Sequence, residues 1–98
     1  MSSIVWTHQA IEDVEAIRTY IARDSVQYAV LVVEQILDAV DRLSRFPFSG
    51  RVVPELQDET VREVILGNYR IVYRVTDDSV QILTVFHASR QFWRAEET

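Results

Sequence analysis

Hydrophobic residues along this chain follow two different periods, and each period predicts a different kind of element. Between residues 8 and 45 they recur every three or four positions, which is the spacing of amphipathic helices. Between residues 61 and 87 they alternate with polar residues and are rich in β-branched and aromatic types, which is typical of strands. A short apolar segment at residues 4–6 comes first and predicts an edge strand. The expected order is therefore β-α-α-β-β-β.

Two helices are expected in the first half of the chain. The first runs from residue 8 to about residue 23, with Thr7 as its N-cap. The second runs from residue 26 to about residue 45, and the Asp24-Ser25 pair provides the break and the second N-cap. Because the connection is so short, the two helices should form an antiparallel hairpin.

The second helix carries more apolar surface than one buried face requires. Its main stripe consists of Ala29, Val33, Ile36, Val40 and Leu43. Tyr28, Leu31 and Val32 add apolar surface on another side of the helix. These three residues either pack against the sheet and the partner helix, or form a surface that another protein chain covers.

Three strands are expected in the second half, at residues 61–66, 69–75 and 80–87. Gly67-Asn68 predicts the turn between the first two, and a polar segment predicts the turn before the third. Within the last strand, strict alternation separates Val80, Ile82, Thr84 and Phe86 from Gln81, Leu83, Val85 and His87. The strands should therefore form an antiparallel meander.

The segment 69–75 should be the central strand of this meander. One of its faces carries Tyr69, Ile71, Tyr73 and Val75. The other face carries Arg70 and Arg74 beside Val72, and two arginines on one face are unusual for a structural sheet. We expect an α+β fold in which a small antiparallel sheet has the helical hairpin packed on one face. The other face is expected to be open and lined by Arg70 and Arg74.

Composition limits the classes of function. The chain has 98 residues, which predicts one domain spanning residues 1–98. Its net charge is −5 and all 10 basic residues are arginines, so it is a poor candidate for general nucleic-acid binding. It has no cysteine and therefore no disulfide or thiolate chemistry. No signal peptide or membrane-spanning run is visible, so a cytoplasmic protein is expected, with no cofactor and no metal.

Several short motifs follow one another in a fixed order. They are the Trp6 strand before an acidic amphipathic helix, L-x-x-F-P-x-x-G-R from Leu43 to Arg51, Pro54-Glu55-Leu56, Arg62-Glu63, Y-R-I-V-Y from Tyr69 to Tyr73, and I-x-x-V-x-H-x-x-R from Ile82 to Arg90. Their order and spacing resemble the RelE/ParE superfamily of toxins from bacterial type II toxin–antitoxin systems. The resemblance covers nearly the whole chain.

This resemblance implies one fold and two activities. ParE-like members poison DNA gyrase, whereas RelE-like members cleave mRNA on the ribosome. Both kinds are neutralised by a small antitoxin that wraps the toxin and usually represses its own operon. A role in plasmid stabilisation and a role in stress response look the same in the sequence.

The acidic composition favours the ParE-like branch, in which growth is inhibited by binding gyrase. Such a poison needs no catalytic group, only a surface that binds one state of its target better than others. The C-terminal tail combines Arg90 and Arg94 with Phe92 and Trp93, and these residue types are common interface anchors. These four residues are the expected target-binding surface, although the two aromatic residues could instead pack the tail onto the body.

The alternative is a ribosome-dependent endoribonuclease. Relatives of the YoeB type use a glutamate, an arginine and a histidine followed by tyrosine, and the matching positions here are Glu55, Arg70 and His87. Arg90 would be a further cation for the phosphate. This sequence departs from the pattern because Ala88 follows the histidine.

Each of these residues also has a purely structural explanation. A loop glutamate is usually solvated, a strand arginine usually pairs with an acid such as Glu63 on the next strand, and a histidine at a strand end is usually hydrogen-bonded. A third possibility is an inactive toxin fold that is retained as an antitoxin-binding partner.

The resemblance also implies a hetero-oligomer with a cognate antitoxin. The expected antitoxin-binding residues are Tyr28, Leu31 and Val32 on the second helix. An amphipathic helix or an extended segment laid into a groove would cover them, and basic segments would suit this acidic chain. No membrane is expected among the partners.

Overall fold

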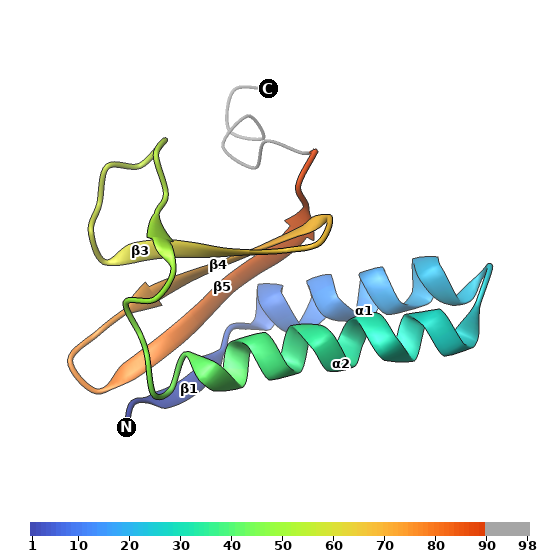
Figure 1. Ribbon diagram of the computed structural model, residues 1–98, viewed down its shortest axis with the longest axis horizontal. Helices are drawn as coiled ribbons and strands as arrows, with labels where there is room; N and C mark the ends of the chain where they lie inside the picture. Colours follow the sequence, from blue (N-terminus) through green and yellow to red (C-terminus); the bar gives the residue numbers. More distant parts are fainter. Residues whose placement is uncertain (90–98) are drawn as a thin grey trace.

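The computed structural model describes residues 1–89 and has a helical hairpin packed on one side of a sheet (Figure 1). Its elements are β1 (Ser3–Trp6), α1 (His8–Ala22), α2 (Val26–Arg42), β2 (Arg51–Val52), β3 (Val61–Leu66), β4 (Tyr69–Val75) and β5 (Ser79–His87). The two helices lie side by side, and the end of the hairpin that contains their connection projects beyond the sheet (Figure 1). The expected α+β fold with a helical hairpin on one face of a sheet is confirmed.

The helices begin where side-chain caps satisfy their first N–H groups. The Thr7 hydroxyl accepts a hydrogen bond from the N–H of Ala10, and the Ser25 hydroxyl accepts one from the N–H of Tyr28, each at 3.1 Å. α2 ends earlier than expected because residues 43–46 continue as turns whose N–H groups bond to the carbonyls of residues 40–42. The two N-caps are therefore confirmed. α2 ends at Arg42, three residues before the expected end at residue 45.

The sheet has the strand order β1-β5-β4-β3-β2, so β4 is central as predicted. The pairs between β2, β3, β4 and β5 are antiparallel. The edge pair is different, because β1 runs parallel to β5, with Ser3 opposite Ser79 and Trp6 opposite Ile82. The expectation of a wholly antiparallel sheet is wrong at this edge. No hairpin joins these two strands, so nothing in the local chain fixes their relative direction.

β2 is a strand that the sequence pattern does not reveal. Its two residues, Arg51 and Val52, pair with Glu63 and Arg62 on β3. Two residues are too few to show an alternating pattern, and Pro54 follows directly. The sequence of residues 51–60 by itself therefore predicts only a polar connection.

A β-bulge in β5 changes which side chains face the helices. Val72 lies opposite Thr84 and Tyr73 lies opposite Ile82, so Leu83 is an extra residue in β5. Val85 consequently joins the same core cluster as Ile82, whereas Leu83 packs with a cluster that does not include either of them. The predicted strict alternation of β5 is wrong, because one inserted residue reverses the order of the faces.

The hydrophobic core has two parts. The larger part joins the sheet to the hairpin and includes Ile36, Leu43 and Tyr73. The smaller part comprises Val53, Val61, Val72 and Phe86, with Leu83 partly buried against it. Because Val72 lies on the face opposite the helices, that face is partly covered by the segment that follows β2. The expectation that it is open is therefore wrong around Val72, although Arg74 is exposed.

Candidate functional site

Arg70 is buried and takes part in an ion pair. Its Nε donates a hydrogen bond to Oε1 of Glu63 at 2.8 Å, and its guanidinium lies 5.3 Å from the centre of the Phe86 ring. The side chain of Glu63 is 0% exposed and that of Arg70 is 8% exposed. The arginine is therefore committed to a neighbouring strand, which is the structural explanation that the sequence offered for it.

Two further charged residues complete this cluster. The Nε of Arg51 donates to Oε2 of Glu63 at 2.5 Å, so the buried carboxylate lies between two guanidinium groups. Oε1 of Glu55 lies 3.7 Å from Nη2 of Arg70, which brings two of the residues proposed for a nuclease together. Of the other two proposed residues, His87 is not part of this cluster, and Arg90 lies outside the described residues.

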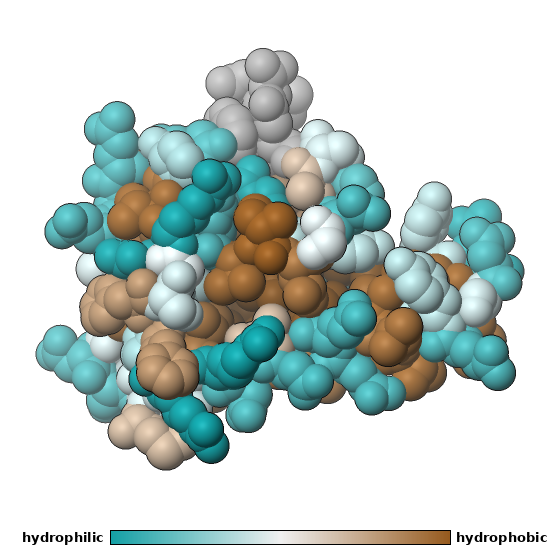
Figure 2. Space-filling model, in the orientation of Figure 1, coloured by the Kyte–Doolittle hydropathy of each residue, from teal (hydrophilic) through white to brown (hydrophobic). Residues whose placement is uncertain are grey.

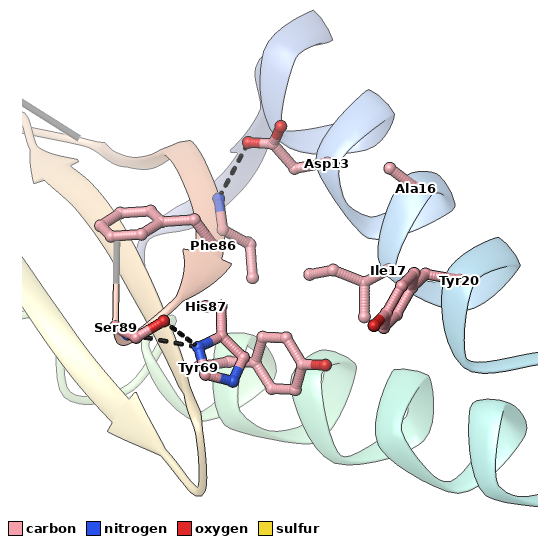
Figure 3. Close-up of a pocket in the computed structure, with 9 residues that line it drawn as sticks. Asp13, Ala16, Ile17, Tyr20, Tyr69, Phe86, His87 and Ser89 are labelled. Carbon is pink, nitrogen blue, oxygen red and sulfur yellow. Dashed lines mark hydrogen bonds between the residues drawn. The ribbon is translucent and has the colours of Figure 1, made fainter. Parts of the chain in front are cut away.

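His87 lies on the opposite side of the sheet from Arg70. The register places Arg70 opposite Phe86 and Tyr69 opposite His87, and successive side chains of a strand point to opposite faces. The imidazole makes an edge-to-face contact with Tyr69, and its Nδ1 is 2.7 Å from the hydroxyl of Ser89 (Figure 3). Hence the three positions that match the YoeB-type pattern do not meet at one surface among residues 1–89.

A pocket of about 490 Å³ lies between α1 and the ends of β4 and β5. We call it the α1–β5 pocket, and its walls include Asp13, Ile17, Tyr20, Tyr69 and His87. Figure 3 shows Ile17 and Tyr20 facing it from α1 and Tyr69 standing beside the imidazole. Burial is the main cause that raises the pKa of Tyr69, and the phenols of Tyr28 and Tyr20 raise it further. The Tyr69 phenol therefore stays protonated near neutral pH. The pocket therefore combines aromatic and apolar walls with the polar groups of Asp13, His87 and Ser89.

Asp13 is the residue of this pocket that sequence reasoning missed. Its Oδ2 accepts hydrogen bonds from the hydroxyl of Thr84 at 2.5 Å and from the N–H of Val85 at 3.1 Å. These bonds tie α1 to the bulged part of β5. In the sequence Asp13 is one of several acidic residues on an amphipathic helix, and nothing in the local pattern marks it as the one that faces the sheet.

The expected antitoxin-binding residues divide between surface and core. Tyr28 and Leu31 are exposed on α2, whereas Val32 is 5% exposed and belongs to the larger core cluster. The expectation that Val32 lies on the same exposed surface is wrong, because it shares the buried face of α2 with Ile36. Figure 2 shows hydrophobic side chains gathered in the middle of the face where sheet and hairpin meet, with hydrophilic ones around them.

The proposed target-binding residues, Arg90, Phe92, Trp93 and Arg94, lie outside the described residues. Within residues 1–89 no cluster of three or more histidine, cysteine or acidic side chains could hold a metal ion. None of the helices in that range is long and apolar enough to cross a membrane.

Known proteins resemble this chain over most of its length. Residues 4–92 match the family model described as ParE toxin of type II toxin–antitoxin system, parDE. The chain is 40% identical over 91 residues to a putative toxin Y4kP of Sinorhizobium fredii, and the matched region covers 91% of each chain. It is 37% identical over 91 residues to toxin RelE2 of Caulobacter vibrioides, and that match covers 92% of this chain and 99% of the relative.

Solved structures give the same picture. The chromosomal ParDE system from P. aeruginosa matches with a TM-score of 0.73 and 27% identity over 89% of this chain and 96% of that one. The RelBE2 toxin–antitoxin complex of Mycobacterium tuberculosis matches with a TM-score of 0.58 and 26% identity over 88% and 96% of the two chains. Because the family model matches nearly the whole sequence and the fold agrees, the chain belongs to the ParE toxin family of the RelE/ParE superfamily.

Proposed function

We propose that this type II toxin acts by binding DNA gyrase and stabilising its cleaved-DNA state, with no bond-making chemistry of its own. The observation that carries the proposal is the burial of Arg70 in its ion pair with Glu63. An RNA-cleaving site needs cations that can reach a phosphate, together with a group that activates the ribose hydroxyl. An arginine enclosed on one face of the sheet and a histidine on the other support a binding role instead.

The alternative is ribosome-dependent mRNA cleavage. One relative carries the name toxin RelE2, and Glu55 does lie near Arg70. In that case Arg70 would have to exchange Glu63 for a phosphate, at the cost of leaving a buried carboxylate with less compensation. We therefore give this activity second place.

The proposed gyrase-binding surface is the C-terminal segment that contains Arg90, Phe92, Trp93 and Arg94. Its sequence mixes cations with large aromatic side chains, a combination that is frequent at interface hot spots.

We also propose a hetero-oligomer with a cognate antitoxin. Two similar solved structures are a ParDE system and a RelBE2 toxin–antitoxin complex. The proposed contact surface on this chain is the exposed pair Tyr28 and Leu31 on α2, without the buried Val32. Leu31→Glu should weaken co-purification of the antitoxin, whereas Leu56→Glu, a similarly exposed leucine in the loop after β2, should not. Equal effects of the two changes on co-purification would show that Leu31 is not part of the antitoxin interface.

Two parallel assays test the target. Purified protein is added to a gyrase supercoiling reaction and to a coupled translation reaction. Inhibited supercoiling with accumulated cleaved DNA, and normal translation, is the expected result. Replacing Phe92, Trp93 and Arg94 by alanine should abolish the inhibition and leave the circular dichroism spectrum unchanged.

Cut mRNA and blocked translation would overturn the gyrase proposal in favour of the endoribonuclease. Loss of that cleavage in His87→Ala would then identify the imidazole as a participant. A folded protein that affects neither reaction but still binds the antitoxin would instead be an inactive toxin fold.

A further inference from the structure

Two phenylalanines are exposed to water on the loop between α2 and β2. Phe46 is 62% exposed and Phe48 is 60% exposed, and only Pro47 separates them. The loop begins at the end of the hairpin opposite to the connection between the two helices (Figure 1). Two large aromatic rings so close together form a small apolar patch, and such patches often mark an interaction site.

The loop that carries these rings is held in place by the core. The hydroxyl of Tyr73, a fully buried residue, donates to the carbonyl of Pro47 at 2.7 Å and accepts from the N–H of Gly50 at 2.9 Å. The N–H of Ser49 bonds to the carbonyl of Phe46 at 3.1 Å and closes a turn. The rings are therefore presented by a fixed backbone, which lowers the entropy cost of binding a partner.

An arginine lies against one of the rings. The guanidinium of Arg62 is 4.8 Å from the centre of the Phe48 ring, and its Nη1 donates to the carbonyl of Gly50 at 2.9 Å. Its Nε donates to the carbonyl of Glu59 at 3.0 Å. These acceptors are backbone carbonyls, and Arg62 has no ion pair within residues 1–89. An uncompensated positive charge therefore lies beside an exposed ring.

Two further arginines precede the first ring. The N–H of Phe46 bonds to the carbonyl of Arg42 at 3.1 Å, so the ring lies one turn beyond this arginine on the same side of the chain. Arg42 and Arg45 are exposed. Although Asp38 and Asp41 are near in the sequence, neither arginine side chain has an ion pair or hydrogen bond in the described part of the chain. Both guanidinium groups are available to an external anion.

Charge is distributed unevenly around this loop. Residues 42–54 contain three arginines and no acidic residue, whereas the rest of the chain contains 7 basic and 15 acidic residues. The third of these arginines, Arg51, is bonded to the buried Glu63. A stretch of one sign in a chain of the opposite net charge is typical of contact with a polyanion. Because the rest of the chain is acidic, such contact would be confined to this loop.

We propose that Arg42, Arg45, Phe46, Phe48 and Arg62 form a contact site for an unpaired DNA strand, and we call it the Phe46/Phe48 surface. Aromatic rings stack on bases of any sequence, and guanidinium groups bind phosphates with a planar fork. The two rings are the stacking platforms, and the three arginines neutralise the phosphates beside them. The core contacts of the loop hold these groups ready for the strand.

The choice of DNA rests on the proposed function, because cleaved DNA is part of the gyrase state that the toxin is proposed to stabilise. Stacking and phosphate pairing would serve RNA equally well, so RNA is one arm of the test. A toxin that touches both the enzyme and its DNA favours the complex over either component alone.

Fluorescence anisotropy of a labelled single strand of DNA, about 12 nucleotides long, measures this contact without gyrase. We expect saturable binding at low salt that weakens as salt is added. The same sequence as a duplex should bind about tenfold more weakly, since paired bases cannot stack on the rings. Absence of binding, or tighter binding of the duplex, would overturn the proposal. Tighter binding of RNA of the same sequence would overturn the assignment to DNA.

Variants of the rings test stacking. The double change Phe46→Ala and Phe48→Ala should weaken binding about tenfold or more. The double change to leucine should weaken it as well, because leucine keeps the apolar surface but has no flat face. Tyr20→Ala removes an aromatic residue that is 67% exposed near the other end of the hairpin, and this control should bind normally. Normal binding by both ring variants, with unchanged melting temperatures, would refute stacking.

Variants of the arginines test the local charge. Arg42→Glu with Arg45→Glu should weaken binding about tenfold and reduce the slope of log affinity against log salt by about 0.7 for each arginine. Arg18→Glu with Arg23→Glu changes the net charge equally on α1 and is the matched control. An equal loss in the control would assign binding to net charge and overturn the site. Equally tight binding of a glutamate peptide would replace the DNA strand by an acidic protein.

The oligonucleotide titration and the gyrase assay fail independently. A protein that binds the strand through these residues but does not inhibit gyrase would contradict the proposed target and leave the Phe46/Phe48 surface intact. A protein that inhibits gyrase but binds no strand would overturn the surface and leave the target intact.

Discussion

The Nε of Arg70 donates to Oε1 of Glu63 at 2.8 Å, across two neighbouring strands and almost completely out of contact with solvent. Burying two charges is costly, and their attraction offsets that cost only while both partners are present. The pair therefore links β3 to β4 on a face that also contains an apolar cluster. The residue that sequence motifs single out as a candidate for catalysis is thus part of the folded core.

Glu63→Gln should destabilise the protein by about 3 kcal/mol, because it removes the closer and more deeply buried of the two carboxylates beside the Arg70 guanidinium. The measurement is urea unfolding followed by circular dichroism. Glu55→Gln is the matched control and should cost less than about 1 kcal/mol, since its contact is longer and more solvated. Similar costs for both variants would show that the Glu63 contact is no stronger than the surface one.

Asp13→Ala should cost about 2 kcal/mol, since the N–H of Val85 and the hydroxyl of Thr84 both lose a charged acceptor. The neighbouring Glu12 is exposed, so Glu12→Ala should change the free energy of unfolding by less than about 0.5 kcal/mol. Hydrogen exchange offers a second measurement, in which the amide of Val85 should lose protection in Asp13→Ala. Retained protection would mean that α1 is held on β5 without this carboxylate.

Tyr73 should make stability fall in alkaline solution. Its hydroxyl donates to the carbonyl of Pro47 at 2.7 Å and accepts from the N–H of Gly50 at 2.9 Å. Burial raises the pKa of Tyr73 above its ordinary value of about 10, and so the native state retains a proton that the unfolded chain releases. The contribution to stability is complete below the unfolded pKa and is lost as pH rises towards the folded one.

The check is urea unfolding of the wild-type protein and Tyr73→Phe at pH 8 and at pH 10.5. The variant should be about 2 kcal/mol less stable at pH 8 because two hydrogen bonds are lost. Its stability should also fall less between the two pH values. A parallel fall in both proteins would assign the alkaline effect to other groups.

Gly50→Ala should destabilise the protein by about 2 kcal/mol. A Cβ at residue 50 would lie 2.6 Å from the carbonyl oxygen of Glu63 and 2.6 Å from the hydroxyl of Tyr73, and the first of these atoms is backbone. Gly67→Ala is the contrasting variant, because a Cβ there meets no atom within 4 Å and only the φ of +58° opposes it, at about 1 kcal/mol. Melting temperatures in the opposite order would show that the backbone near residue 50 yields more easily than the turn.

The sequence predicts the elements whose signals are local. Thr7 and Ser25 mark the helix starts, and Gly67-Asn68 marks the turn between two strands whose bounds agree with the structure. The face of β4 that holds Arg70 also follows from simple alternation. The alternating pattern does not show whether another segment of the chain covers that face. The burial of Arg70 could therefore not be predicted.

The remaining differences arise from contacts between distant parts of the chain. The extra residue at Leu83 is visible only once β5 is paired with β4, because a bulge is a property of two strands. The partnership of Asp13 with Thr84 joins residues 71 positions apart. The candidate site is for the same reason less predictable than the fold, since it depends on which side chains of several elements finally meet.

The parallel pairing of β1 with β5 has a consequence for the timing of synthesis. Residues 3–6 are synthesised before both helices and strands β2 to β4, whereas their partners at 79–82 are synthesised after all of these. Contacts of such high sequence separation form late and slowly, because the intervening chain must first be ordered. A nascent chain therefore lacks this edge pair until residues 79–82 have been synthesised.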